Sequence, residues 1–265
     1  MNTYLDAILQ RTREDVKAQI KRQTVSVLKD LPGYHAPRRP FELRLRGASP
    51  VIIAEIKAAS PSLGVIREDM DVAAIARSYV AAGAAALSVL TDEPFFHGRL
   101  EYLPLARAGH TIPVLRKDFI LDPYQLYQAR AYEADAVLLI VAALEREQLM
   151  DLKHLADELG LEVLAEIHSE AELEVLSEGD FRIVGVNNRD LSTFVTDLQT
   201  SVRLRPLVRK EAVCVSESGI RTGTDIRSLQ SHGIGAFLIG ESLMRTPDPG
   251  DTLRRLLDDV RGPFA

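Results

Sequence analysis

The chain has 265 residues, of which 46% are hydrophobic, and a formal net charge of −6. That length fits one large α/β domain with a sizeable core, and the mild acidity gives no reason to expect nucleic acid or membrane as a partner. No stretch has the length and apolarity of a membrane span or signal peptide, and the single cysteine, Cys214, excludes an internal disulfide, so we expect a cytoplasmic protein.

Residues 1–47 differ from the rest and predict a helical extension. Ile8, Val16, Ile20 and Leu28 form a loose helical stripe among charged residues, and a connector rich in proline and arginine follows. An apolar stripe needs a surface to cover it. We therefore expect the extension to pack over the catalytic face of a barrel formed by residues 48–265, giving one domain overall; a partly disordered tail is the alternative.

From Val51 onward, short apolar strands alternate with helical patterns, and Gly83, Gly160 and Gly233 stand where helices should end. Eight nearly unbroken apolar strands, each followed by a helix, predict an α/β fold, a closed parallel (β/α)8 TIM barrel. An open doubly wound sheet would offer a glycine-rich loop after its first strand, where this chain has no glycine. The predicted strands are 51–56, 85–90, 112–115, 136–141, 162–167, 183–186, 212–215 and 236–239, and the predicted helices are 72–82, 100–107, 123–133, 146–159, 170–177, 198–208, 224–231 and 249–260.

The first strand, V-I-I-A-E-I, runs into K-A-A-S-P-S. Glu55 and Lys57 are two residues apart, so in a strand both side chains point to the same side. Opposite charges directed inward from a buried strand are costly unless they are paired or used. A structural ion pair is one interpretation of this motif, and a functional site is the other.

The ends of the later strands favour the functional interpretation. Active sites of such barrels lie at the C-terminal ends of the strands, and seven of the eight predicted strands end in polar or aromatic groups. Lysines held among carboxylates can stay protonated and donate a proton, and a glutamate against apolar walls can become a general acid or base. The converging residues are Glu55, Lys57, Ser60, Phe96, Lys117, Phe119, Glu166, Asn187, Arg189, Glu217 and Ser218.

Two loops have the composition of a phosphate site. S-G-I-R follows the seventh strand and G-E-S-L-M follows the eighth, each before a helical segment. Glycine there lets backbone N–H groups approach an anion at a helix N-terminus, and this fold commonly binds phosphate after these two strands. Each glycine, including Gly219 and Gly240, could instead mark a plain turn.

We predict neither a metal site nor a cofactor. The six histidines are scattered, and no pair has ligand spacing on one element. His168 follows a strand end and could assist the site, although a surface or capping role is the favoured interpretation. Cys214 lies within an apolar run and is interpreted as a buried small hydrophobe rather than a nucleophile.

Eight motifs in order resemble those of indole-3-glycerol-phosphate synthase, from about residue 4 to the C-terminus. They are E-I-K-A-A-S-P-S, L-T-D-E-P-F-F-H-G, L-R-K-D-F-I, A-D-A-V-L-L-I-V, A-E-I-H, G-V-N-N-R-D-L, S-E-S-G-I and I-G-E-S-L-M. The resemblance implies a carbon–carbon lyase of tryptophan biosynthesis. Its substrate, the small phosphorylated molecule 1-(2-carboxyphenylamino)-1-deoxyribulose 5-phosphate, is cyclised with loss of CO2 and water to indole-3-glycerol phosphate.

The resemblance also implies a role for each residue at the strand ends. Lys57 would meet the substrate carboxylate, Lys117 would protonate the ketose carbonyl, and Glu166 would serve the dehydration, although spacing does not settle how the lysines divide the proton transfers. Glu55, Asn187, Ser218 and Glu217 would position hydroxyls and amine, Arg189 would lie near the carboxylate, Phe96 and Phe119 would flank the ring, and Ser60, Gly219, Gly240, Glu241 and Ser242 would line the phosphate pocket, largely through backbone N–H groups.

The chain departs from the family pattern at a few positions. Ala58, Ala59 and Leu63 stand where basic residues are usual, which leaves the first loop less positive, and Glu133 replaces a common glycine.

Three other interpretations of the function remain open: a phosphoribosylanthranilate isomerase, which would need a cysteine and aspartate pair; a Schiff-base aldolase using Lys117; and a barrel that only binds ligand. We expect a monomer, with a weak homodimer as the alternative.

Overall fold

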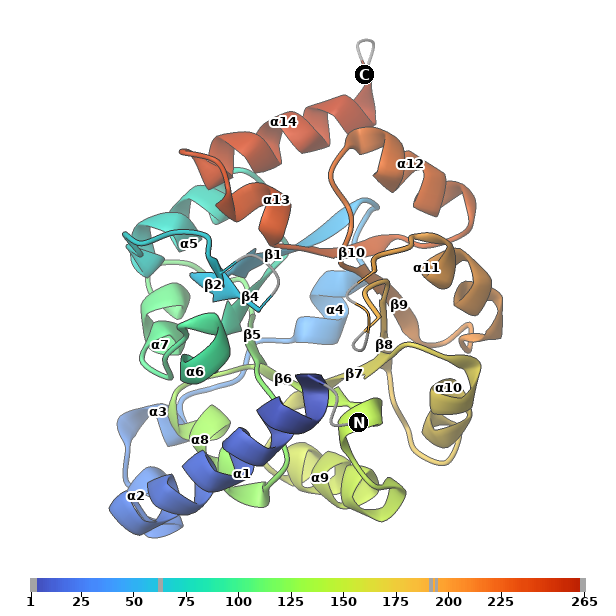
Figure 1. Ribbon diagram of the computed structural model, residues 1–265. Coiled ribbons are helices and arrows are strands. Elements are labelled where there is room, and N and C mark those ends of the chain that lie inside the picture. Colours follow the sequence, from blue (N-terminus) through green and yellow to red (C-terminus); the bar gives the residue numbers. More distant parts are fainter. Residues whose placement is uncertain (1–3, 62–63, 191–192, 194, 263–265) are drawn as a thin grey trace.

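The structure is a computed structural model that describes residues 4–61, 64–190, 193 and 195–262. Within these residues eight parallel strands close into a barrel in the order β1-β10-β9-β8-β7-β6-β5-β4, surrounded by helices (Figure 1). This confirms the predicted (β/α)8 barrel. The barrel strands are β1 (Val51–Ile56), β4 (Ala86–Leu90), β5 (Val114–Lys117), β6 (Ala136–Ile140), β7 (Glu162–Ile167), β8 (Ile183–Asn187), β9 (Val213–Glu217) and β10 (Ala236–Ile239).

The outer helices follow the strands as the sequence predicts, with boundaries set by local signals. Asp122 caps the helix that begins at Pro123, and Gly83, Gly160 and Gly233 adopt φ values of 100°, 67° and 78° where the chain leaves a helix. The outer helices are α5 (Val72–Ala81), α7 (Tyr102–Arg107), α8 (Pro123–Ala131), α9 (Arg146–Glu158), α10 (Glu170–Leu176), α11 (Gln199–Leu204), α12 (Gly223–Ser231) and α14 (Pro249–Arg261). Short elements lie in the connections: the strands β2 (Ala59–Ser60) and β3 (Gly64–Val65), the helices α6 (Glu93–Phe96) and α13 (Glu241–Met244), and the 3-10 helices η1 (Val141–Ala143) and η2 (Arg205–Leu207).

The two-residue period of each strand divides its side chains between two cores. Ile52 and Ile56 of β1 belong to the core between barrel and helices, whereas Val51 and Ile53 belong to the barrel interior. The next inward residue of β1 is Glu55. The interior is therefore apolar along most of β1, and the charges of this strand begin at Glu55, toward its C-terminal end.

The chain before β1 contacts both ends of the barrel. Helix α4 (Phe41–Leu45) closes the N-terminal end, where Phe41 and Leu45 are buried in the interior core, and it is visible through the barrel in Figure 1. Helix α1 (Tyr4–Arg22) crosses the opposite face beside α8, and α2 (Val25–Lys29) and α3 (Pro32–His35) also pack against α8. None of the helices in the described residues combines the length and apolarity needed to span a bilayer.

Strand β5 differs from the prediction of 112–115 by ending two residues later. The cause is the buried Arg116, whose guanidinium bonds Asp118 at 2.9 Å and the Gln125 carbonyl. Because its charge is paired with Asp118 outside the barrel, Arg116 can form part of a buried strand. Helix α6 was not predicted either, and it forms because the Asp92 carboxylate accepts the backbone N–H groups of Phe95 and Phe96.

Candidate active site

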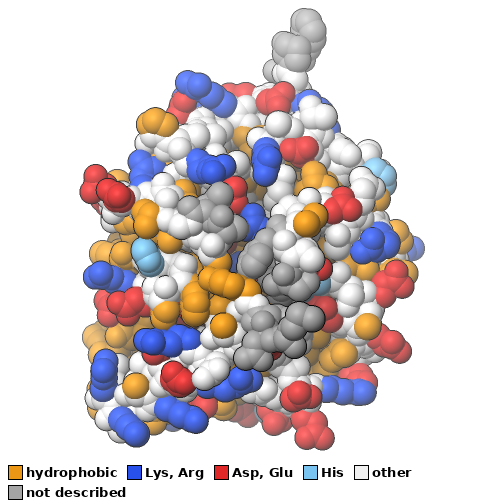
Figure 2. Space-filling view, in the orientation of Figure 1, with side chains coloured by type: hydrophobic (Ala, Val, Ile, Leu, Met, Phe, Trp, Pro, Cys, Tyr) orange, Lys and Arg blue, Asp and Glu red, His pale blue; other side chains and the backbone are white. Residues whose placement is uncertain are grey.

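A cavity of about 370 Å³ opens among the C-terminal ends of the barrel strands. Its size suits a small organic ligand, and hydrophobic side chains gather near the centre of this face (Figure 2). The cavity brings together every residue that the sequence assigned to the site: Glu55, Lys57, Ser60, Phe96, Lys117, Phe119, Glu166, Asn187, Arg189, Glu217, Ser218, Gly219, Gly240, Glu241 and Ser242.

The first ion pair of the cavity joins Lys57 and Glu55, with 2.9 Å between Nζ and Oε1. Both side chains are almost buried, as expected for neighbours on one side of a strand. A Cβ at Gly240 would stand 2.4 Å from the same carboxylate oxygen, so glycine is needed there to leave room for Glu55. The pair presents a cation to the cavity from the β1 side.

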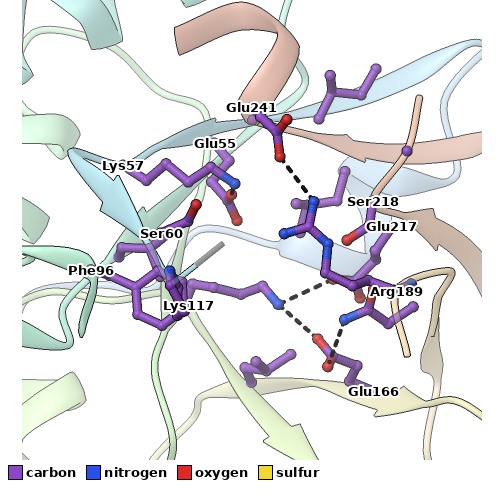
Figure 3. Close-up of a pocket in the computed structure, with 18 of the residues that line it drawn as sticks. Glu55, Lys57, Ser60, Phe96, Lys117, Glu166, Arg189, Glu217, Ser218 and Glu241 are labelled. Atoms are coloured by element: carbon purple, nitrogen blue, oxygen red, sulfur yellow. Dashed lines mark hydrogen bonds and ion pairs between the residues drawn. The ribbon is translucent and has the colours of Figure 1, made fainter. Parts of the chain in front are cut away.

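A second group of charges surrounds Lys117. Its Nζ lies 2.7 Å from Glu166 Oε2 and 3.2 Å from Glu217 Oε2, and Asn187 donates to Glu166 Oε1 at 3.0 Å (Figure 3). Burial by itself would lower the pKa of Lys117, but Glu166 and then Glu217 outweigh it and raise that pKa. Burial would raise the pKa of Glu166, and the Lys117 cation holds it below its ordinary value.

Glu217 has the opposite electrostatic balance. Burial, opposed by Lys117 but supported by the Glu166 charge, raises the pKa of Glu217 to about 7. Apart from the Lys117 ion pair, its oxygens have no hydrogen-bond partner among the described residues, and the carboxylate occupies the space above Gly185, where a Cβ would stand 2.0 Å from Oε1. Two carboxylates around one lysine thus titrate in different pH ranges.

A third ion pair, between Arg189 and Glu241, crosses the cavity mouth at 2.9 Å (Figure 3). The backbone N–H of Arg189 donates to Asn187 Oδ1, which ties this residue to the Asn187 amide that contacts Glu166. The Glu241 side chain is thus directed to a cation. Any contact of Glu241 with a phosphate would involve its backbone, as the sequence suggested.

Apolar surface completes the cavity. Phe96 and Phe119 lie with ring centroids 6.1 Å apart and planes tilted by 39°. Sequence reasoning expected residues 1–47 over the catalytic face but named none of them in the site, and it missed the apolar floor, where inward strand residues reach the cavity. The missed lining residues include Leu90, Leu138, Ile140 and Leu238 from the strands, and Tyr4, Leu5 and Ile8 from α1. The two-residue period of the strands was a usable signal for the first group.

The loops after β9 and β10 form the end of the cavity expected to hold phosphate. Ser218 and Gly219 adopt φ values of 65° and 81°, and Ser242 Oγ donates to the Ile220 carbonyl at 3.1 Å. The buried Ser60 hydroxyl has no hydrogen-bond partner among the described residues. Two cations that sequence reasoning passed over, Arg221 and Arg245, also line this end.

The remaining residues singled out in the sequence lie elsewhere. Cys214 is buried in the outer core, and burial raises the pKa of its thiol to about 12, which makes it a poor nucleophile. Glu133 holds a left-handed φ of 66° and pairs with Arg107 at 3.0 Å, away from the cavity. Ala58 and Ala59 are buried beside the first loop, and Leu63 lies outside the described residues. Among those residues no group of three histidine, cysteine or acidic side chains could hold a metal ion.

Comparison with solved structures supports the fold. The chain superposes with a TM-score of 0.60 on a chain of the tryptophan synthase complex from Pyrococcus furiosus, at 14% identity, covering 81% of this chain and 99% of that one. Thiamine phosphate pyrophosphorylase from the same organism gives a TM-score of 0.60 at 16% identity, covering 84% and 98%. At such identities the likeness concerns the barrel alone.

Comparison of sequences is more specific. Proteins named indole-3-glycerol phosphate synthase are 48% identical over 261 residues in Legionella pneumophila and 46% identical over 263 residues in Acidithiobacillus ferrooxidans, each covering 98% of this chain and 100% of the relative. The model of the family described as indole-3-glycerol phosphate synthase matches residues 5–256. With the strand-end motifs in place, the chain belongs to the indole-3-glycerol phosphate synthase family.

Proposed function

We propose that the cavity carries out the ring closure implied by the family, with its residues divided between binding and proton transfer. In that reaction the ring carbon that bears the carboxylate bonds to the ketose carbonyl carbon, CO2 leaves, and water is then lost to form the indole. The observation that carries the proposal is the position of Lys117, a buried cation that faces the cavity from between two carboxylates.

Binding of the anthranilate part falls to cationic and aromatic groups. Lys57, the cation on the β1 side, would meet the carboxylate, with Arg189 close by at the mouth. Phe96 and Phe119 line the cavity and would flank the aromatic ring. A bound carboxylate would compete with Glu55 for Lys57, so this ion pair stands in for a contact made with substrate.

Proton donation to the carbonyl oxygen falls to Lys117. Its two carboxylate neighbours keep it protonated despite burial. Glu217 loses its charge below about pH 7, which weakens one of the two attractions and lets Lys117 give up a proton more readily. A strongly protonated lysine is a poor nucleophile, so the geometry favours acid catalysis over a Schiff base.

The later dehydration falls to Glu166, which stays ionised beside Lys117 and can accept a proton. Asn187 orients it through a hydrogen bond of 3.0 Å, and Glu55, Ser218 and Glu217 line the space that the substrate hydroxyls and amine would occupy. The loops after β9 and β10 would hold the phosphate through their backbone N–H groups, together with the Ser60 hydroxyl from β2. The residues that we expect to line this phosphate site are Ser60, Gly219, Gly240, Glu241 and Ser242.

We also propose that residues 1–47 belong to the catalytic unit and that the enzyme acts as a monomer. Tyr4, Leu5 and Ile8 of α1 line the cavity beside residues from the strand ends of the same chain. Deleting α1 should therefore weaken substrate binding, measured as a raised KM. The accompanying loss in the free energy of unfolding should be smaller than the loss in binding free energy. An unchanged KM in the truncated protein would remove α1 from the site.

The direct test is formation of indole-3-glycerol phosphate from the synthetic substrate, followed by indole fluorescence. We expect turnover by the wild-type chain and strong loss in Lys117→Ala. Borohydride added during turnover should trap no covalent adduct. A trapped adduct at Lys117 would replace acid catalysis by a Schiff base, and binding without turnover would leave only a ligand-binding barrel.

A further inference from the structure

One histidine near the cavity has no assigned function. His168 follows β7 directly, and its imidazole stands between two carboxylates, Glu166 inside the cavity and Glu172 on α10. The distances are 3.6 Å from Nε2 to Glu166 Oε1 and 3.3 Å from Nδ1 to Glu172 Oε2, and the side chain is 13% exposed. His168 therefore links the first turn of an outer helix to a carboxylate of the active site.

The outer carboxylate is firmly held. Glu172 Oε2 accepts the backbone N–H of His168 at 2.9 Å, and Glu172 Oε1 accepts the Ser169 hydroxyl at 3.1 Å. Ser169 in turn caps α10 by accepting the backbone N–H of Glu172. These bonds resemble a capping box, and they fix the carboxylate that orients the imidazole.

The inner contact constrains the protonation of His168. A carboxylate only accepts hydrogen bonds, so Nδ1, which faces Glu172, must carry a proton. Nε2 faces the ionised Glu166 and has no hydrogen-bond partner among the described residues. In a neutral ring one of the two nitrogens has a lone pair in place of a proton, and that lone pair would face a carboxylate. Only the imidazolium presents an N–H to both.

The surrounding charges agree with this form. Burial would lower the pKa of His168, but the hydrogen bond to Glu172 and the charges of Glu166, Glu172 and Glu217 together raise it. These carboxylates come from three elements, α10, β7 and β9. The opposing cation is Lys117 on β5, which is bound to Glu166 on its other side at 2.7 Å.

We propose that His168 is a positioning residue for Glu166: the imidazolium, anchored by Glu172, keeps that carboxylate ionised and turned toward Lys117. The inference rests on the proposed role of Glu166 in the dehydration. A second cation beside Glu166 keeps it ready to take a proton from the substrate and favours release of that proton after the step. His168 acts through Glu166 and needs no contact with substrate.

The first experiment measures the imidazole itself, without turnover. NMR titration of the full chain, with the His168 signal assigned through His168→Gln, should give a pKa above the ordinary value of about 6.5. That pKa should fall in Glu172→Gln, where glutamine can still accept the backbone N–H, and also in Glu166→Gln. An unchanged pKa in Glu166→Gln would overturn the proposal.

The second experiment measures single-turnover rate and KM. Both His168→Gln and Glu172→Gln should lower the rate by about 10-fold or more, up to the roughly 10²-fold that displacing a catalytic group by about 1 Å can cost, and leave KM within about twofold. His154→Gln is the matched control, because His154 pairs with Glu158 at the same four-residue spacing but with 78% of its side chain exposed. It should change nothing. A normal rate in His168→Gln would overturn the proposal.

The two experiments separate this inference from the proposed function. A wild-type chain that forms no product while the pKa of His168 still responds to Glu166→Gln would reject the reaction and support the contact. Product formation by a chain in which that pKa is insensitive to Glu166→Gln would support the reaction and reject the contact.

Discussion

Both ends of the barrel bury charged side chains, but among the described residues the N-terminal end pairs them more completely within the chain. At the N-terminal end, Asp135 is fully buried and accepts the backbone N–H groups of Arg39 and Val114 and a guanidinium N–H of Arg107, at 2.8, 2.9 and 3.2 Å. Glu162 there accepts two further backbone N–H groups at the start of α4. One Arg107 nitrogen, Nε, has no partner among the described residues, although the rest of that guanidinium is bonded.

At the C-terminal end, buried polar atoms are left open toward the cavity. Ser60 Oγ has no hydrogen-bond partner among the described residues, and the Glu217 oxygens have none there beyond the ion pair of Oε2 with Lys117 at 3.2 Å. Buried polar groups normally find partners, and those that do not require an explanation. The difference indicates that one end is built for stability and the other to complete its bonds with a ligand, as is general for this fold.

We expect the largest effect from removing a buried, hydrogen-bonded carboxylate at the N-terminal end of the barrel. Asp135→Ala leaves Arg107 and two backbone N–H groups without their acceptor, and we expect it to lower the free energy of unfolding by about 3–5 kcal/mol with little change in kcat of the folded enzyme. Equilibrium denaturation measures this. The control is Asp180→Ala, whose side chain is 69% exposed in its ion pairs and should cost under about 1 kcal/mol. Equal costs for the two variants would contradict the comparison.

At the C-terminal end, Lys117→Arg should lower the catalytic rate and leave folding intact, the reverse of what we expect for Asp135→Ala. The positive charge between Glu166 and Glu217 is kept, so the protein should fold and bind substrate. A guanidinium with a pKa above about 12 holds its proton too firmly for acid catalysis, and the single-turnover rate should fall by about 10²-fold or more. Lys57→Arg, which replaces one carboxylate-binding cation by another, should lose less rate and more affinity. A near-normal rate in Lys117→Arg would transfer the acid role to Lys57.

A smaller effect is expected at the phosphate end. A Cβ at Gly219 would stand 2.5 Å from Thr196 Cγ2 and obstruct the backbone N–H groups of the loop, so Gly219→Val should raise KM about 10-fold. Inorganic phosphate should compete with substrate in the wild type and much less in the variant. Gly109→Val is the control, since Gly109 has nearly the same φ, 79° against 81°, with nothing within 4 Å of its Cβ position. Unchanged KM would place the phosphate elsewhere.

The smallest effect concerns pH. Because the pKa of Glu217 is raised to about 7, this group is protonated below that pH and ionised above it. The negative charge of Glu217 raises the pKa of Lys117 and makes its proton harder to donate. The single-turnover rate should therefore decline as pH rises through about 7. The decline should be absent in Glu217→Gln. A profile that is identical in the two proteins would assign the titration to another group.

The pH dependence of stability gives a second measure of the same group. Folding raises the pKa of Glu217 from its ordinary value of about 4.5, so the folded state binds this proton more tightly than the unfolded chain. The contribution of Glu217 to stability should therefore be intact below about pH 4.5 and be lost as pH rises toward 7. Glu217→Gln should remove that part of the pH dependence in chemical denaturation.

Much of the architecture could be predicted because it depends on local rules. The two-residue period of a strand placed Glu55 and Lys57 on one side, and the closure of parallel strands brought Lys117, Glu166 and Glu217 to one end. Strand ends were harder to place where charge was involved. The sequence alone does not reveal that Arg116 is neutralised by Asp118, and the predicted strand therefore stopped before it.

The barrel, the direction of the strand side chains and the charged residues at the strand ends follow from periodicity and chain order, which need no knowledge of distant contacts. The partners of these residues emerge once the chain has folded: Lys117 with Glu166 and Glu217, Arg189 with Glu241, and His168 between two carboxylates. It also decided that α4 fills one end of the barrel and α1 reaches the cavity at the other. Ion pairing depends on distances between atoms far apart in the chain, and those distances exist only once the barrel has closed.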